Sequence, residues 1–300
     1  MKKFFAMAAI LLLAASCSNE SELTVNNAQE ETAPVKVRVS DFSMSMDEMS
    51  SEGGSTRAAQ DAASYDGVGA ITLAFYDASG NEVVKTTQIK TDGSTYTTFG
   101  EFSANLPVGN YSMVAVARGY FDGDAFTLTS PTLAAYTSER PRETFCAKQD
   151  VTVTSASPLD LDVTLSRISA KLEIISTDNR PAGISKVRTT FAKGGKSFNP
   201  TTGLTTVDTG FSQTNSPSSA NGSPIDIAMM PLLYTDEESM NVTIEVLDPS
   251  ENVLFTKVVP NVPFKRNRQT TLTGAVFSAD ASSATFKLET SWLASETVPF

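Results

Sequence analysis

Short segments in which apolar and polar residues alternate recur along most of this chain, and they constrain its fold more than any other feature. Examples are residues 35–40 (Val-Lys-Val-Arg-Val-Ser) and residues 285–292 (Thr-Phe-Lys-Leu-Glu-Thr-Ser-Trp). In an extended strand, alternation puts the apolar side chains on one face. Turns rich in Gly, Pro and Asn separate the segments, and no long amphipathic helix pattern occurs. The pattern predicts an all-β chain built from sandwiches.

The strands are expected on both sides of residues 165–169, in two sets of comparable length. Residues 77–81 (Asp-Ala-Ser-Gly-Asn) predict a hairpin turn, and a longer loop is expected around residues 131–143. The predicted strands lie at residues 35–42, 70–76, 82–87, 96–106, 111–117, 151–154, 159–165, 170–176, 186–191, 225–232, 241–247, 253–259, 268–276 and 285–292. Two domains, 34–166 and 167–300, follow from this division.

The N-terminus has the pattern of a lipoprotein secretion signal. Lys2 and Lys3 precede an apolar run, which ends in small residues leading to Cys17. The run is too short for a membrane-spanning helix, which needs about 20 apolar residues. The pattern predicts removal of residues 1–16 and acylation of Cys17, with residues 17–33 as a polar tether. The alternative is a chance cysteine behind an ordinary signal peptide.

The charge and residue content exclude several classes of function. Loss of residues 1–16 would remove two lysines and no acidic residue, changing the net charge from −11 to −13. Such an acidic chain is not expected to bind nucleic acid. The chain contains no histidine, so a Ser-His-Asp triad is impossible. With Cys17 acylated, Cys146 has no partner for an intramolecular disulfide.

A few short motifs suggest chemistry, but each has a simpler interpretation. Residues 194–197 (Gly-Gly-Lys-Ser) resemble the end of a phosphate-binding loop, yet Thr190 stands where that pattern needs glycine. Residues 77–81 and 122–124 resemble pieces of calcium loops without the closing glutamate, so both are expected to be turns.

Asp160 and Asp162 fall on one face of a predicted strand, about 7 Å apart by strand rise. This spacing could suit a paired-carboxylate glycosidase, although the solvent face of a half-buried strand is the simpler interpretation. Cys146 has no histidine to activate it, so a buried or idle thiol is expected. We expect no enzyme activity, cofactor or metal site.

Several sequence segments resemble the fimbrillin superfamily, the two-domain lipoprotein subunits of type V pili. The resemblance rests on the order of these segments behind the Cys17 motif, since no single one is diagnostic. They are residues 71–77 with Gly80, residues 106–111 (Leu-Pro-Val-Gly-Asn-Tyr), residues 165–172, residues 262–268 with Thr271 and Gly274, and the closing Trp292.

The resemblance implies two transthyretin-like Greek-key sandwiches and a lipoprotein of the outer membrane surface that polymerises into a fimbrium. An arginine-specific protease would cut at Arg57-Ala58, in an exposed loop, and release the strand at residues 35–42. The C-terminal strand of another subunit, with Phe286, Leu288 and Trp292, would then fill the opened groove. The partners are therefore other pilus subunits, the protease and the outer membrane.

Two other roles stay open at this stage. Anchor or tip subunits of the same family do not polymerise, and anchors keep their lipid and are not cut. A surface carbohydrate-binding lipoprotein is the second alternative, although it would normally display several exposed aromatic residues, and this chain has one tryptophan. Host or bacterial surface ligands are compatible with either role.

Overall fold

The described part of the chain consists of strands and the turns that join them. The structure, a computed structural model, describes residues 31–43, 60–62, 64–91, 96–123, 125–137, 140–155, 157–278 and 287–290. These residues form strands β1 to β20 and no helix, which confirms the predicted all-β fold. Accordingly, none of them belongs to a helix that could cross a membrane.

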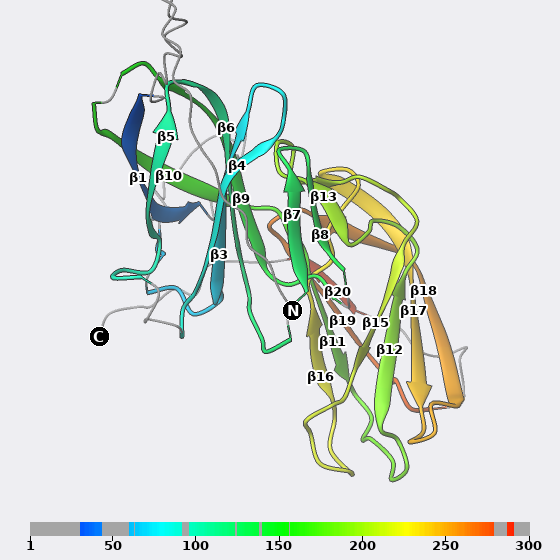
Figure 1. The fold of residues 1–300 in the computed structure, drawn as a ribbon. Helices are drawn as coiled ribbons and strands as arrows, with labels where there is room; N and C mark the ends of the chain where they lie inside the picture. Colours follow the sequence, from blue (N-terminus) through cyan, green and yellow to red (C-terminus); the bar gives the residue numbers. More distant parts are fainter. Residues whose placement is uncertain are drawn as a thin grey trace, which may run out of the picture. The chain divides into compact units, whose positions relative to one another are not determined.

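The largest sheet is formed by the first half of the chain, in the order β2-β1-β10-β9-β6-β3-β4, with β5 also paired to β1 (Figure 1). β9 and β10 are paired at Ser166 with Cys146 and at Arg167 with Phe145. The sheet folds over at this short pairing. Its strands are β1 (Thr32–Ser43), β2 (Gln60–Asp61), β3 (Ala70–Asp77), β4 (Glu82–Ile89), β5 (Glu101–Pro107), β6 (Gly109–Arg118), β9 (Thr144–Val153) and β10 (Leu159–Arg167).

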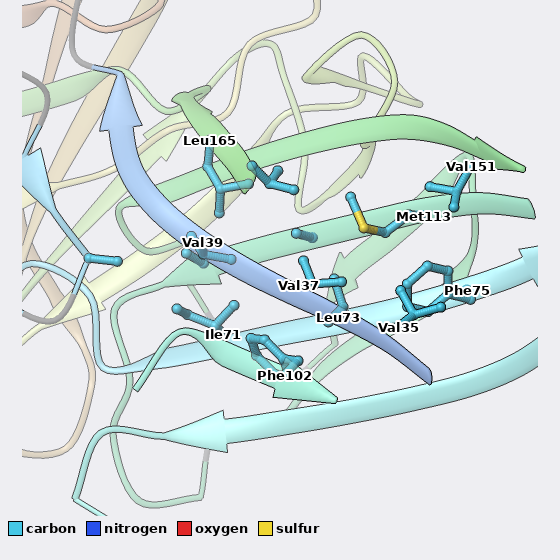
Figure 2. Close-up of a cluster of buried hydrophobic side chains, with 14 of the residues drawn as sticks. Val35, Val37, Val39, Ile71, Leu73, Phe75, Phe102, Met113, Val151 and Leu165 are labelled. Atoms are coloured by element: carbon cyan, nitrogen blue, oxygen red, sulfur yellow. The ribbon is translucent and has the colours of Figure 1, made fainter. Parts of the chain in front are cut away.

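The first hydrophobic core lies inside this folded sheet. Its side chains come from β1, β5 and β10 on one side and from β3, β6 and β9 on the other. Figure 2 shows β1 crossing over the strands of the opposite layer, with its valines directed into the core. Alternation in β1 is therefore explained by one buried and one solvent-facing side. The buried residues labelled there are Val35, Val37, Val39, Ile71, Leu73, Phe75, Phe102, Met113, Val151 and Leu165.

The second hydrophobic core lies between two four-stranded sheets from the second half of the chain. Their orders are β16-β11-β19-β20 and β15-β12-β17-β18, and residues of both contribute to one cluster. This arrangement is a sandwich. The strands are β11 (Lys171–Ser176), β12 (Lys186–Phe191), β15 (Phe211–Asn215), β16 (Asp226–Met229), β17 (Glu237–Leu247), β18 (Val253–Lys265), β19 (Gln269–Gly274) and β20 (Lys287–Thr290).

The edge strand β18 carries a charged residue on its inner side. Lys257 is registered with the core residue Ile244 of β17, so the two share a face. Lys257 is 5% exposed, and its Nζ has no hydrogen-bond partner among the described residues. Inward-pointing charges and prolines on an edge strand oppose pairing with other chains. β18 has both, because Pro260 and Pro263 also lie in it.

A small third sheet joins the two halves of the chain. Its order is β14-β13-β8-β7, and β8 pairs with β13 at Ala135 with Ser197 and at Ala134 with Phe198. A third apolar cluster beneath it combines residues such as Tyr76, Phe198 and Leu232. The strands are β7 (Phe126–Ser130), β8 (Leu133–Tyr136), β13 (Ser197–Asn199) and β14 (Leu204–Thr205).

The structure corrects the prediction of strands in several places, two of which are residues 131–143 and 192–224. The prediction of a loop at residues 131–143 was wrong in part, because β8 lies within these residues and pairs with β7 and β13. No strand was predicted between residues 192 and 224, where β13, β14 and β15 occur. These strands have two to five residues, and such short segments carry too little alternation to be recognised. The division into domains at residue 166 stays a prediction, with Leu165 in the first core and Ala170 in the second.

Candidate functional site

The first strand of the described chain occupies an interior position between two strands that are distant in sequence. β1 pairs in parallel with β10, with Val35 opposite Leu159 and Val39 opposite Val163. On its other edge it pairs antiparallel with β5, with Val37 opposite Phe102. We call the space between β5 and β10, which β1 fills, the β1 slot (Figure 1).

The inner side of β1 is buried along its whole length. Ala33, Val35, Val37 and Val39 are at most 3% exposed. Phe42 is fully buried, and the centroid of its ring lies 4.7 Å from that of Phe145 and 5.8 Å from that of Tyr65. Fully burying one such side chain contributes about 1.5–3 kcal/mol. The buried contacts of this face therefore hold β1 firmly in the sheet.

The outer side of β1 is basic and lies between acidic neighbours. Lys36 is registered with Asp160 of β10 and Ser103 of β5, and Arg38 is registered with Asp162 and Glu101. A surface cavity of about 370 Å³ is lined by residues of all three strands on this side. Opposite charges on directly opposed residues stabilise strand pairing by about 0.2–1 kcal/mol each. We call Asp160, Asp162 and Glu101 the acidic rim of the slot. Its negative charges complement the basic residues of β1.

This register also accounts for the two aspartates that had suggested a paired-carboxylate site. Asp160 and Asp162 are exposed on the outer face of β10, beside the basic residues of β1. The solvent-face interpretation fits this placement. Sequence reasoning missed Glu101 and Ser103, since alternation predicts the face of a strand but not its neighbours. The complementary charges of residues 36–38 and 160–162 were the available signal.

After β1 the chain returns beside the strand that it has just left. β2 pairs with the end of β1, at Asp61 with Asp41 and at Gln60 with Phe42. Residues 44–59 between them lie outside the described residues, and the predicted cleavage site Arg57-Ala58 falls there. The predicted acylation site Cys17 also lies outside the described residues.

A buried polar cluster lies next to Phe42 and connects the two halves of the chain. The Arg167 guanidinium, with its side chain 2% exposed, is 2.6 Å from Glu143 Oε1. Arg167 also donates hydrogen bonds to Asn267 Oδ1 at 3.0 Å and to Tyr65 Oη at 2.9 Å. The Tyr65 hydroxyl donates to Glu143 at 2.6 Å, and burial together with Glu143 raises the pKa of Tyr65 well above its usual value.

The predicted donor segment is described only in part. Residues 287–290 form β20, which pairs antiparallel with β19, and Leu288 is opposite Leu272. Phe286 and Trp292 lie outside the described residues. Before this segment, the Asp178 carboxylate accepts backbone hydrogen bonds from Val276 and Phe277 at 2.7 and 2.8 Å. β20 has four residues and lies at the end of its sheet.

The other motifs form turns and buried contacts. Asp77 Oδ1 accepts backbone hydrogen bonds from Ser79 and Asn81 in the β3–β4 turn, both at 2.8 Å. Residues 194–197 lead into β13, which begins at Ser197, and not into the helix that a phosphate loop requires. Cys146 is buried, its thiol donates to the Pro200 carbonyl at 3.4 Å, and burial raises its pKa to about 12. Within the described residues, no three His, Cys, Asp or Glu side chains are grouped to hold a metal.

Solved structures show the same fold at very low sequence identity. A Bacteroides thetaiotaomicron protein proposed to bind polysaccharide is 11% identical, with 88% of this chain and 99% of that chain covered and a TM-score of 0.52. A Bacteroides ovatus protein proposed to be an adhesin is 9% identical, with coverage of 86% and 95% and a TM-score of 0.52. The fimbrial anchor protein Mfa2 of Porphyromonas gingivalis is 10% identical, with coverage of 87% and 98% and a TM-score of 0.51.

The comparisons agree with the predicted likeness to fimbrillins at the level of the fold. No curated protein matches the chain. The model of a family of unknown function (DUF6562) matches residues 31–292. Since this match spans most of the sequence, the chain belongs to the family of unknown function DUF6562.

Proposed function

We propose that this protein is a structural subunit of a cell-surface pilus, exported as a lipoprotein and joined to other subunits by exchange of strands. The observation that carries the proposal is the position of β1 between β5 and β10. Its link to the rest of the described chain is residues 44–59, so one cut there leaves β1 held by non-covalent contacts alone. The fold shared with a fimbrial anchor protein supports the same role.

In this proposal an arginine-specific surface protease cuts at Arg57-Ala58. The released strand carries the acylated Cys17 with it and thereby frees the subunit from the outer membrane. Because β1 is buried on its inner face and paired on both edges, it would leave slowly by itself. We therefore expect an incoming strand to displace it, rather than to enter an empty slot.

The incoming strand would be the C-terminal segment of another copy, with Phe286, Leu288 and Trp292 as its apolar residues. The short β20 would have to leave β19 first, which is a modest cost for four residues at the end of a sheet. Residues 34–166 and 167–300 act in this scheme as two domains, one that accepts a strand and one that donates it. No enzymatic step by the subunit is involved.

Intact mass and N-terminal sequencing of protein sheared from cells, beside the cell-bound fraction, test the proposal. A mature chain that begins at Ala58 and forms a ladder of polymers in unboiled gels is the expected result. A chain that keeps acylated Cys17 and forms no ladder would overturn the polymerising role.

A non-polymerising anchor is the second candidate, and the fold shared with a fimbrial anchor protein favours it. The described chain has both ends of the exchange occupied, with β1 in its slot and β20 paired to β19. An anchor would keep β1 and its lipid, and would accept no strand at this slot. Retention of the lipid together with co-purification of pilus material would identify this role, whereas glycan binding without pili would identify a carbohydrate-binding lipoprotein.

A further inference from the structure

The acidic rim of the β1 slot selects which strand can replace β1, and in which register. This inference rests on the proposed strand exchange and adds to it the chemistry of the partner. The inner side of the slot is lined by apolar residues, which suit a strand with alternating apolar residues. The outer side presents Asp160 and Asp162 from β10 and Glu101 from β5, beside Lys36 and Arg38 of β1.

The strongest selection is expected at the position that Arg38 occupies. A residue at this position is registered with Asp162 of β10 on one edge and with Glu101 of β5 on the other, so it has an acidic neighbour on both sides. The Lys36 position has one acidic neighbour, Asp160, and Ser103 on the other edge. Like charges directly opposite one another destabilise a strand pair. An acidic residue at the Arg38 position would therefore be disfavoured twice.

Of the two registers that put Phe286 and Leu288 in the places of neighbouring valines of β1, one satisfies this rule. Apolar Phe286 and Leu288 alternate with Lys287 and Glu289, so a slip by two residues keeps the apolar residues inside. If Phe286 and Leu288 took the places of Val35 and Val37, Glu289 would fall between two acids. If Phe286 and Leu288 took the places of Val37 and Val39, Lys287 would lie between the two acidic residues instead.

The second register also keeps Glu289 away from the acidic rim. Glu289 would then take the place of Ser40, which lies at the irregularity where the pairing with β10 shifts between Val39 and Asp41. We infer that the β1 slot accepts a strand of alternating apolar and basic residues, and that the C-terminal segment of a second copy binds there with Lys287 in the place of Arg38.

Displacement of β1 by synthetic peptides tests this inference on the full chain. The chain is first cut within residues 51–57, and β1 carries a fluorescent label. Unlabelled peptides of residues 284–294 are then added in excess. A peptide of residues 31–43 is the positive control. We expect Lys287→Glu to raise the peptide concentration for half-displacement about tenfold at low salt. Most of this difference should vanish at 1 M salt, where screening is strong.

A second peptide fixes the register. Glu289→Lys should change displacement less than twofold, because Ser40 has no acidic partner in the pairing. A large gain from Glu289→Lys would place residue 289 between the acids and overturn the proposed register. On the protein, Glu101→Gln with Asp162→Asn should abolish the difference between the native peptide and its Lys287→Glu variant. Asp66→Asn with Asp150→Asn, two exposed carboxylates outside the slot, should leave that difference intact.

The outcomes separate this inference from the proposed function. Displacement by all peptides without regard to residue 287 would overturn charge selection and leave strand exchange standing. If the peptide of residues 31–43 displaces β1 and no C-terminal peptide does, the slot is exchangeable and the proposed donor is wrong. If no peptide displaces β1, the proposed strand exchange fails, and the inference fails with it.

Discussion

Replacing Phe42 with alanine should loosen β1 more than any other single truncation in that strand. Phe42 is fully buried, and its ring contacts those of Phe145 and Tyr65. Truncation of a buried phenylalanine to alanine typically costs about 3–5 kcal/mol, since the site collapses only partly around the cavity. In the intact chain, urea unfolding should show a free energy of unfolding lower by about this amount.

The cut chain makes the same loss visible as release of β1. Each 1.4 kcal/mol corresponds to a factor of about ten in a dissociation constant, so the Phe42→Ala strand should bind roughly a hundred- to several thousand-fold more weakly. Gel filtration of the cut protein, with the label on β1, measures the fraction retained. Val83→Ala, in an exposed position of β4, is the matched control and should change stability by less than about 1 kcal/mol.

A loss below about 1 kcal/mol for Phe42→Ala, or equal retention of β1 in both cut proteins, would refute the reasoning. Either result would mean that the aromatic cluster does not hold β1 in place. The backbone pairing with β5 and β10 would then carry the attachment, and the inner face would matter little for exchange.

Three further changes test other parts of the structure. Glu143→Gln leaves the buried Arg167 without its carboxylate and should lower the free energy of unfolding by about 3–5 kcal/mol. The control, Glu251→Gln in an exposed pair, should lower it by under about 1 kcal/mol. Equal losses for the two variants in urea melts would contradict this expectation. Lys257→Met removes a buried ammonium without a partner and should raise stability by about 1–2 kcal/mol, so a lower unfolding midpoint would argue against it. Burial raises the pKa of Cys146 to about 12. In a Cys17→Ser background, iodoacetamide at pH 8.5 should therefore alkylate Cys146 in urea but not in the native protein, as measured by mass spectrometry. Rapid alkylation of the native protein would show instead that the thiol is accessible.

Alternation in the sequence predicts the faces of the strands well, and their neighbours poorly. Residues 35–40 predict a strand with valines inside, and Figure 2 shows Val35, Val37 and Val39 in the core. The same pattern carries no information about β10, whose Leu159 is registered with Val35 from 124 positions along the chain. Pairing over such a distance depends on the packing of the whole sheet, which local periodicity does not encode.

Prolines account for one error in a strand boundary. The strand predicted at residues 253–259 continues as β18 to Lys265, through Pro260 and Pro263. Proline interrupts the hydrogen bonds of an interior strand but is tolerated at a sheet edge, and β18 ends its sheet in the described structure. The sequence alone does not say that a strand is an edge strand, so stopping at the first proline was the reasonable prediction.

The parallel pairing of β1 with β10 has a consequence for the order in which the protein folds. β1 is made first, but the residues that pair with it on β5 and β10 follow 60 and more positions later, and contacts this distant in sequence form slowly. β1 can pair with β2 and β5 before β10 has emerged, but its other edge stays without a partner strand until β10 follows. A newly made chain thus passes through a stage in which the strand that we propose is later exchanged is held along one edge alone.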